Sequence, residues 1–517
     1  MPTVRESLSY EPSELKFGTS GLRGLVTEMT DLECYINTAG FLKFLVNAGH
    51  LQSGGTVYVA GDLRDSTPRI TGAVIQAIQD GGYKPAYEGS IPTPAVAFYG
   101  LQHKTASIMV TGSHIPADRN GIKFNKADGE VLKADEAGIK EAVAQVRADL
   151  YAQDAETAAF DAQGMLKTPA VLPEAENAAR DAYMQRHTDV FDGQTFAGKQ
   201  IVFYQHSAVG RDMLVEMLQK LGAEVIPVGR SDIFVPIDSE NVTPTDAAYF
   251  KQLSEEYPDA FAIVSTDGDS DRPFVVDENG VFHRGDELGA VVATWLKADA
   301  AAYPVSSSDA VDGYLNNNGV EWAHTRIGSP FVIVAMQEEQ AKGKQRVVGW
   351  EVNGGFMLGV DLEVNGHNLA ALPTRDAILP IIIALRAAID AGGTVSSVFA
   401  ALPQRFTGAG LIDNFPTEVS QKIVAQYSAD NEQVHAALGQ FFTSQHNFGA
   451  VEKIDALDGV RIFFDNGEIA HLRPSGNAPQ LRIYSVADSQ ARADEIVALA
   501  IAEPDGIFRS IEKALSA

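Results

Sequence analysis

Short apolar runs of strand length alternate with longer segments of helical periodicity along most of this chain, and this alternation restricts its fold more than any other feature. One unit begins with an apolar run at residues 56–60 and continues through a polar loop at 61–68. A helical pattern follows at 70–79, then a glycine pair and a second apolar run at 83–87. Strand–helix–strand units of this kind are typical of layered α/β domains.

The same order recurs in the middle of the chain. An apolar run at 201–204 is followed by a helical pattern at 212–221 and by a further run at 223–228. A third α/β stretch begins near residue 285 and ends with the apolar run 377–389, which predicts a helix. The two units of the same layout suggest a duplicated domain.

The pattern changes after residue 403. Three short strand-like runs occur near residues 461–484, with a hairpin turn predicted at Asp465-Asn466-Gly467 and a helix at 489–502. This order predicts a C-terminal α+β domain with an antiparallel sheet. The Ala-, Glu- and Asp-rich segment 136–162 is expected to be helical. The expected domains are 1–185, 186–284, 285–403 and 404–517.

Composition excludes several classes of protein. The chain has 517 residues and a net charge of −28, so its surface repels nucleic acid and anionic membranes. A small anionic substrate needs basic residues gathered locally. A single cysteine, Cys34, cannot form an internal disulfide, which favours the cytoplasm. No apolar signal core and no apolar run of membrane-spanning length is present.

Ser113 is the first candidate for chemistry. It lies just past a predicted strand at 107–110, where α/β sheets place reactive groups. A serine nucleophile needs a base, a metal or an activated state. His114 is a poor base for it, because neighbours on extended backbone point to opposite sides. The Gly-x-Ser-x-Gly elbow is absent, which argues against a hydrolase triad; the alternative is a polar turn.

Two basic residues lie in turn-rich segments. A proline and an Asn-Gly pair between Ser113 and Lys123 predict turns that fold Lys123 back toward the serine. The loop 17–24 holds three glycines and two hydroxyl residues around Arg23. Such a loop suits an anion, although taken alone it is equally an ordinary surface loop.

Three carboxylates form the second candidate. Asp267, Asp269 and Asp271 alternate between apolar strands at 262–266 and 273–276. They repel one another, so a cation is their natural counter-charge, and oxygen ligands favour Mg²⁺ or Ca²⁺ over Zn²⁺. An EF-hand is excluded because Arg272 stands where its loop requires glycine. A solvated acidic turn is the alternative.

Two later loops have polar groups suited to a sugar phosphate. Glu351 and Asn353 lie on a glycine-rich loop after a strand, where they could hold sugar hydroxyls or simply close a hairpin. A second loop could surround a phosphate dianion, or could be a plain turn between strands. Its candidate residues are Arg473, Ser475, Gly476, Asn477 and Arg482.

Taken in order, these segments resemble the α-D-phosphohexomutase superfamily, which includes phosphomannomutases and phosphoglucomutases. Residues 111–116 match its Thr-x-Ser-His-x-Pro, 267–272 its Asp-Gly-Asp-x-Asp-Arg, and 19–24 its Thr-Ser-Gly-x-Arg-Gly motif. The sugar motif lies at 351–354 and the phosphate motif at 473–479. Three positions depart: Asn477 stands where threonine is usual, Ala478 where glutamate is common, and Gly355 where many relatives carry histidine.

The resemblance implies four domains around a central cleft. Three are similar α/β domains with mixed sheets, and the last is an α+β domain that closes the cleft. It implies interconversion of hexose 6-phosphate and hexose 1-phosphate through a phosphoserine at Ser113 and a hexose 1,6-bisphosphate. The implied metal is Mg²⁺, held by Ser113, Asp267, Asp269 and Asp271. The implied catalytic residues are Ser113, Lys123, Arg23, His114 and Arg272. The implied substrate-binding residues are Glu351, Asn353, Gly354, Arg473, Ser475, Gly476, Asn477 and Arg482.

Mannose phosphate is the favoured substrate, with glucose phosphate second and amino-sugar phosphate third. A Mg²⁺-dependent sugar phosphatase with an aspartate nucleophile is the main alternative from another class, and a non-catalytic sugar-phosphate-binding protein is the third. The expected assembly is a monomer or homodimer, with no nucleic-acid or membrane partner.

Overall fold

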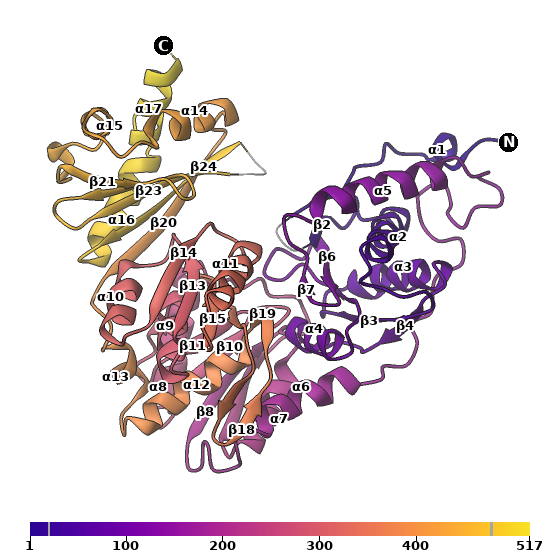
Figure 1. Ribbon diagram of the computed structural model, residues 1–517, viewed down its shortest axis with the longest axis horizontal. Coiled ribbons are helices and arrows are strands. Elements are labelled where there is room, and N and C mark those ends of the chain that lie inside the picture. The colour runs from indigo at the N-terminus through magenta and orange to yellow at the C-terminus, as the bar shows by residue number, and fades with distance from the viewer. Residues whose placement is uncertain (19–20, 476–478, 517) are drawn as a thin grey trace. The chain divides into compact units, whose positions relative to one another are not determined.

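The computed structural model describes residues 1–18, 21–475 and 479–516. It divides into two compact units, which are taken in turn below. Unit 1 comprises Met1–Ala300 and Gly328–Val398, and unit 2 comprises Ala301–Ile327 and Phe399–Ala517. Sheets with helices beside them recur through the chain, as Figure 1 shows, and this confirms the α/β class.

The first sheet of unit 1 has the order β1-β2-β6-β5-β3-β4, with β7 beside β6. Strand β5 runs parallel to β3 and antiparallel to β6, so the sheet is mixed as expected. The strands are β1 Lys16–Phe17, β2 Gly21–Leu25, β3 Thr56–Gly61, β4 Lys84–Tyr87, β5 Ser107–Val110, β6 Arg119–Lys126 and β7 Gly129–Glu130. The accompanying helices are α1 Val4–Ser7, α2 Asp31–Asn47, α3 Thr67–Asp80, α4 Thr93–Gln102 and α5 Glu136–Tyr151.

Helices α2 and α5 approach closely because two glycines face the partner helix. A Cβ at Gly40 would lie 2.4 Å from a Val143 methyl, and one at Gly138 would lie 2.9 Å from the Phe44 ring. The N-terminus of α2 is capped by the Thr30 hydroxyl, which accepts from the Glu33 amide.

The prediction of a helix through residue 162 is wrong for residues 152–162. Helix α5 ends at Tyr151, and the chain then turns at Asp154, whose carboxylate accepts from the Glu156 amide. The Val4 amide donates to the Gln153 carbonyl, so this stretch pairs with the N-terminus. An alanine-rich composition alone does not reveal such a tertiary partner.

The second sheet of unit 1 has the order β12-β11-β10-β8-β9. Strands β8 and β9 are parallel and joined through α7, whereas β10 and β11 form an antiparallel hairpin. The strands are β8 Gln200–His206, β9 Glu224–Arg230, β10 Ala262–Thr266, β11 Pro273–Val276 and β12 Phe282–His283. The helices are α6 Ala178–Thr188, α7 Arg211–Lys220 and α8 Pro244–Glu256.

The rest of unit 1 contains an antiparallel set, β15-β16-β19, and a small hairpin, β17-β18. The predicted apolar helix is α12, on which Ile381, Ile382 and Ile383 are all fully buried. Burial of each such side chain contributes about 1.5–3 kcal/mol. The strands are β15 Val347–Trp350, β16 Phe356–Leu358, β17 Leu362–Val364, β18 His367–Leu369 and β19 Leu372–Asp376. The helices are α9 Gly285–Trp295, α11 Ser329–Ala341, α12 Ile378–Asp390 and α13 Val395–Phe399.

Unit 2 has the predicted antiparallel sheet, in the order β20-β24-β23-β22-β21. The turn predicted at residues 465–467 joins β22 to β23, with Phe463 opposite Ile469. Its strands are β13 Ala300–Pro304, β14 Glu321–Thr325, β20 Phe406–Asp413, β21 Val451–Asp455, β22 Val460–Phe464, β23 Ile469–Pro474 and β24 Gln480–Ala487. Its helices are α10 Asp309–Asn317, α14 Thr417–Tyr427, α15 Glu432–Leu438, α16 Gln490–Ile501, α17 Ile507–Ser516 and the short 3₁₀ turn η1 Ser444–His446.

No helix in the described ranges has the length and apolar character needed to cross a bilayer.

Two buried histidines make stability depend on pH. Burial lowers the pKa of His206 and of His471 from 6.5 to about 4 in each case. Each ring donates from Nε2 to a backbone carbonyl, while its Nδ1 is buried with no hydrogen-bond partner among the described residues. Protonation is therefore penalised in the folded state, so the unfolded state binds more protons below pH 6.5.

The free energy of unfolding is expected to fall by about 2 kcal/mol per histidine between pH 7 and pH 5. Urea unfolding at both pH values measures this. The variant His471→Gln keeps a donor for the Asp458 carbonyl without titrating, and should weaken the pH dependence by one histidine's share. An unchanged difference between pH 7 and pH 5 in this variant would contradict the prediction.

Candidate functional site

Ser113 lies at the carboxyl end of β5 in a left-handed conformation, with φ of 55°. Its side chain is buried, and its hydroxyl donates to Asp267 Oδ2 at 2.7 Å. The Ser113 amide donates to the Thr111 hydroxyl at 2.8 Å, which closes the turn. A positive φ at a serine is uncommon and must be held by its surroundings. The fold therefore brings together the first two candidates of the sequence, 154 residues apart.

The three carboxylates at 267, 269 and 271 are fully buried on the hairpin between β10 and β11, here called the metal loop (residues 267–272). One oxygen from each lies within 4.8 Å of the others. In the part of the chain that the structure describes, Asp269 Oδ1 and Asp271 Oδ1 are buried without a hydrogen-bond partner. Buried unpartnered carboxylate oxygens are costly, and a hard cation would satisfy them. The residues present therefore fit a metal ion.

Lys123 reaches the metal loop by a different route from the predicted one. The Asn-Gly pair at 120–121 lies within strand β6, and the chain reverses earlier, where the Arg119 amide donates to the Pro116 carbonyl. The antiparallel pairing of β6 with β5 then directs Lys123 Nζ to Asp269 Oδ2 at 2.5 Å and to Asp271 Oδ2 at 2.6 Å. The lysine faces the carboxylates, and no hydrogen bond joins it to Ser113 among the described residues.

Two carboxylates of the metal loop, Asp267 and Asp271, have pKa values shifted in opposite directions. Burial and the charges of Asp269 and Asp271 raise the pKa of Asp267 well above its usual value. Burial also opposes ionisation of Asp271, but Lys123, Arg375 and Arg272 outweigh it and hold its pKa below the usual range. A bound cation would remove the cost of ionising Asp267.

His114 lies closer to Ser113 than the extended-chain argument predicts. Its Nδ1 is 3.4 Å from Ser113 Oγ, because the positive φ of Ser113 turns both side chains to one side. Burial, together with Arg272 and Arg23, lowers the pKa of His114 to about 2. The imidazole is thus neutral and a weak base, for an electrostatic rather than a geometric reason.

The two predicted catalytic arginines differ in exposure. Arg272 is buried and contacts Asp238 Oδ1 at 3.1 Å, with its Nε 3.9 Å from Asp267 and 3.8 Å from Asp271. Arg23 is exposed on β2, whose backbone pairs with β6. Thr19 and Ser20, which belong to the same motif as Arg23, lie outside the described residues.

The sugar loop (residues 351–355) is a tight hairpin between β15 and β16. Glu351 and Asn353 are both buried, and Asn353 Oδ1 accepts from the Gly355 amide at 3.0 Å. Gly354 has a φ of 86°, which glycine adopts without strain. Ser239 holds the loop from outside by donating to the Asn353 carbonyl at 2.7 Å. The loop is thus both a hairpin turn and a rigid polar surface.

The predicted phosphate loop lies in unit 2, on the hairpin of β23 and β24. Arg473 and Arg482 are directly paired across the two strands, and the Ser475 amide donates to the Gln480 carbonyl at 3.0 Å. Like charges at paired positions repel, so an anion beside them would be stabilised. Asp458 offsets part of the charge by accepting from Arg473 Nε at 3.0 Å. Gly476 and Asn477 lie outside the described residues.

Comparison with known proteins shows the family to which the chain belongs. Phosphoglucomutase/phosphomannomutase family models match α/β/α domain I at residues 14–149, domain II at 181–280, domain III at 284–406 and the C-terminal domain at 418–503. A phosphomannomutase of Sinorhizobium fredii strain NGR234 is 41% identical over 488 residues, which cover 94% of this chain and 98% of the relative. The chain belongs to the phosphoglucomutase/phosphomannomutase family.

Further relatives support this membership, which makes the chain a phosphohexomutase, an isomerase that transfers phosphoryl groups. A phosphomannomutase of Salmonella muenchen is 40% identical over 94% of both chains. The solved structure of a phosphoglucomutase/phosphomannomutase family protein from Burkholderia thailandensis superposes with a TM-score of 0.71 over 98% of both chains, at 18% identity. That last likeness concerns the fold.

Several residues that shape the phosphohexomutase site escaped the sequence analysis. Arg64 donates to the carbonyls of Ser113 and Ile115 at 2.9 and 2.6 Å, and also to those of Pro116 and Arg119. It therefore holds the segment 113–119 in place. Asp62 anchors Arg64 at 3.1 Å. Thr93 donates to Asp269 Oδ2 from the start of α4. In the sequence, only their place in the polar loop 61–68, after the apolar run 56–60, pointed to Asp62 and Arg64. No local sequence pattern pointed to Thr93.

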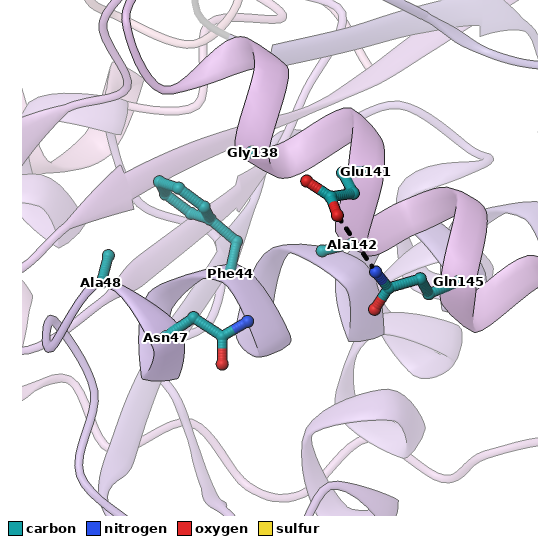
Figure 2. Close-up of a pocket in the computed structure, with 7 residues that line it drawn as sticks. All are labelled: Phe44, Asn47, Ala48, Gly138, Glu141, Ala142 and Gln145. Carbon is teal, nitrogen blue, oxygen red and sulfur yellow. Dashed lines mark hydrogen bonds between the residues drawn. The ribbon is translucent and has the colours of Figure 1, made fainter.

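A separate hollow of about 340 Å³ lies between α2 and α5 (Figure 2). Its lining combines Phe44 and small side chains with Glu141 and Gln145, which share a hydrogen bond of 3.4 Å. None of the predicted site residues lines it, so it plays no part in the site.

Proposed function

We propose that this phosphohexomutase interconverts mannose 6-phosphate and mannose 1-phosphate, with Ser113 as the phosphoryl carrier. The observation that carries the proposal is the 2.7 Å contact between the Ser113 hydroxyl and Asp267 inside a buried triple-aspartate loop. Relatives named phosphomannomutase, at 41% and 40% identity over 94% of the chain, support mannose as the hexose.

Charge counting supports Mg²⁺ as the ion of the metal loop. With Asp267 ionised, the carboxylates of the loop face an equal number of cations, namely Lys123, Arg272 and Arg375. Phosphorylation of Ser113 would add about −1.5 to −2 charges, which a divalent ion would balance. Asp267, Asp269, Asp271 and a phosphoserine oxygen would hold it. When bound, Mg²⁺ supplies neutralising charge to the phosphoryl group during transfer.

In the forward step, a hydroxyl of the hexose phosphate attacks phosphoserine 113. The bond between phosphorus and Ser113 Oγ breaks, a bond to the hexose oxygen forms, and the product is a hexose 1,6-bisphosphate. The proton of the attacking hydroxyl ends on Ser113 Oγ. Lys123, a cation hydrogen-bonded to the loop carboxylates, is placed either to stabilise the developing charge or to shuttle that proton, giving one proton to the leaving oxygen and then taking one from the hydroxyl. His114, with its pKa near 2, is a neutral donor or acceptor rather than a general base. After the intermediate turns around, its other phosphate returns to Ser113.

Other polar residues would orient the substrate. Glu351, Asn353 and Gly354 would hold sugar hydroxyls, and Arg23 and Arg272 would stabilise the reacting phosphoryl group. The non-reacting phosphate would bind at the hairpin of unit 2, through Arg473, Ser475, Gly476, Asn477 and Arg482. The proposal keeps four domains with boundaries at 185, 284 and 403, a cytoplasmic location, and a monomer or homodimer.

A coupled assay tests the choice of sugar. Mannose 1-phosphate, glucose 1-phosphate and glucosamine 1-phosphate are compared, each with and without the matching 1,6-bisphosphate. We expect the highest kcat/KM for mannose 1-phosphate and a lag without bisphosphate, because unphosphorylated enzyme must first be primed. Highest kcat/KM for glucose 1-phosphate would make the chain a phosphoglucomutase, and release of free phosphate without isomerisation would indicate the phosphatase alternative.

A further inference from the structure

A buried arginine that the sequence analysis did not single out joins the metal loop to the sugar loop. Arg375 stands near the end of β19 and is 6% exposed. Its Nε donates to Asp271 Oδ2 at 3.1 Å, and its Nη1 donates to Glu351 Oε2 at 2.8 Å. One rigid guanidinium therefore fixes a carboxylate of each loop. The planar fork of arginine presents these donors in fixed directions from different nitrogens, which the single flexible ammonium of lysine cannot do.

A glycine of the sugar loop makes room for this side chain. A Cβ at Gly355 would lie 2.6 Å from both Cγ and Cδ of Arg375, well inside contact distance. Any larger residue at 355 would displace the arginine. Gly355 and Arg375 are therefore spatially complementary.

The domain I strand β7 supports the same arrangement. Ser329 Oγ accepts from Arg375 Nη1 at 3.0 Å and donates to Glu130 Oε2 at 2.7 Å. Glu130 Oε1 in turn accepts from the Thr374 hydroxyl at 2.5 Å, next to Arg375. The arginine is thus restrained on both sides, so movement of one loop carboxylate displaces the other.

A neighbouring buried arginine, Arg186, forms an ion pair that contacts neither the metal loop nor the sugar loop among the described residues. Arg186 is also buried and donates to Asp376 Oδ2 at 2.8 Å, on the same strand. It ties α6 to β19 and, among the described residues, forms no hydrogen bond or ion pair with either loop. Arg186 is therefore a matched control for the loss of a buried guanidinium.

We propose that Arg375 is a positioning residue that couples cation binding at the metal loop to sugar-phosphate binding at the sugar loop, and that Gly355 is the residue that admits it. The inference rests on the proposed function. Because coupling is reciprocal, Mg²⁺ should tighten hexose-phosphate binding by the same factor by which the sugar phosphate tightens Mg²⁺ binding. Couplings of this kind are typically about 5- to 150-fold.

Isothermal titration calorimetry of the full-length chain, in a Ser113→Ala background that prevents turnover, measures this factor. MgCl₂ is titrated with and without mannose 1-phosphate, and with and without glucose 1-phosphate. We expect at least about fivefold coupling with one sugar. Arg375→Lys keeps the charge but not the fork, and should reduce the coupling to less than about twofold. Gly355→Ala keeps the Arg375 guanidinium but displaces it, and it should also reduce the coupling to less than about twofold. If Arg375→Lys does not fold, the coupling measured in Gly355→Ala tests the inference.

Arg186→Lys is the control. It is expected to lower the thermal unfolding temperature while leaving the coupling factor as it was. Unchanged coupling in Arg375→Lys and Gly355→Ala, equal loss of coupling in Arg186→Lys, or no coupling in the reference chain would each overturn the inference. Failure of both sugar phosphates to bind would instead overturn the proposed function, and with it the inference that rests on it.

Discussion

Ser113→Ala is expected to lower mutase turnover by at least about 10³-fold, because the phosphoryl group would lose its carrier. The Ser113 hydroxyl contacts the metal loop from just beyond β5, and among the described residues no other serine or threonine hydroxyl donates to the Asp267 carboxylate. Turnover is measured by the coupled assay with the 1,6-bisphosphate present. Incubation with the bisphosphate followed by mass spectrometry should show a phosphorylated chain before the substitution and none after it.

Ser107→Ala is the matched control for this variant. Ser107 is buried on β5, the strand that precedes the Ser113 turn, but its hydroxyl accepts from the Asn125 side-chain amide and does not contact the metal loop. Its loss should reduce stability by about 1 kcal/mol and leave turnover within about twofold. Near-normal turnover in Ser113→Ala would exclude this serine as the carrier.

Asp269→Asn is expected to weaken Mg²⁺ binding at least about tenfold and to slow turnover by about 10²-fold or more. The substitution replaces a carboxylate proposed to hold the ion with a neutral amide, and so removes a negative charge next to Lys123. Calorimetric titration of MgCl₂ reports binding without reliance on catalysis, and the Mg²⁺ dependence of the coupled assay reports the second effect.

The same change from aspartate to asparagine at the exposed residue Asp232, in the same domain, is the control. Its side chain is 96% exposed and lies 3.5 Å from Arg211. Asp232→Asn should change neither the Mg²⁺ affinity nor the rate. An Asp269→Asn variant with the same Mg²⁺ titration as the unmodified chain would refute the metal loop.

Elements with a strong local signal were predicted well. The strand at 107–110 and the hairpin turn at 465–467 match the structure, since buried apolar runs and Asn-Gly turns are short-range features. Where a local pattern competed with a distant partner, prediction was wrong. Residues 152–162 pair with the N-terminus instead of continuing α5, and Asn120-Gly121 pairs with β2 instead of turning.

The residues of the candidate site also fall into two groups, those that the sequence marks and those that only the structure identifies. Alternating aspartates and a strand-end serine are recognisable in the sequence because their spacing is itself the signal. Arg64, Thr93 and Arg375 have no such spacing. Each acts on a partner roughly 50 to 180 residues away, and only the hydrogen bonds of the folded chain identify them.

By itself, the sequence determined the α/β layers and the family, and it marked the candidate residues of the site, because hydrophobic periodicity and motif spacing are properties of the chain. The tertiary structure alone decided which cation meets which carboxylate. Lys123 faces the aspartates rather than the serine, and Arg375 fills the space beside Gly355. Because these groups are buried, the contacts are energetically important: a charge removed from water must have a partner, or its pKa shifts.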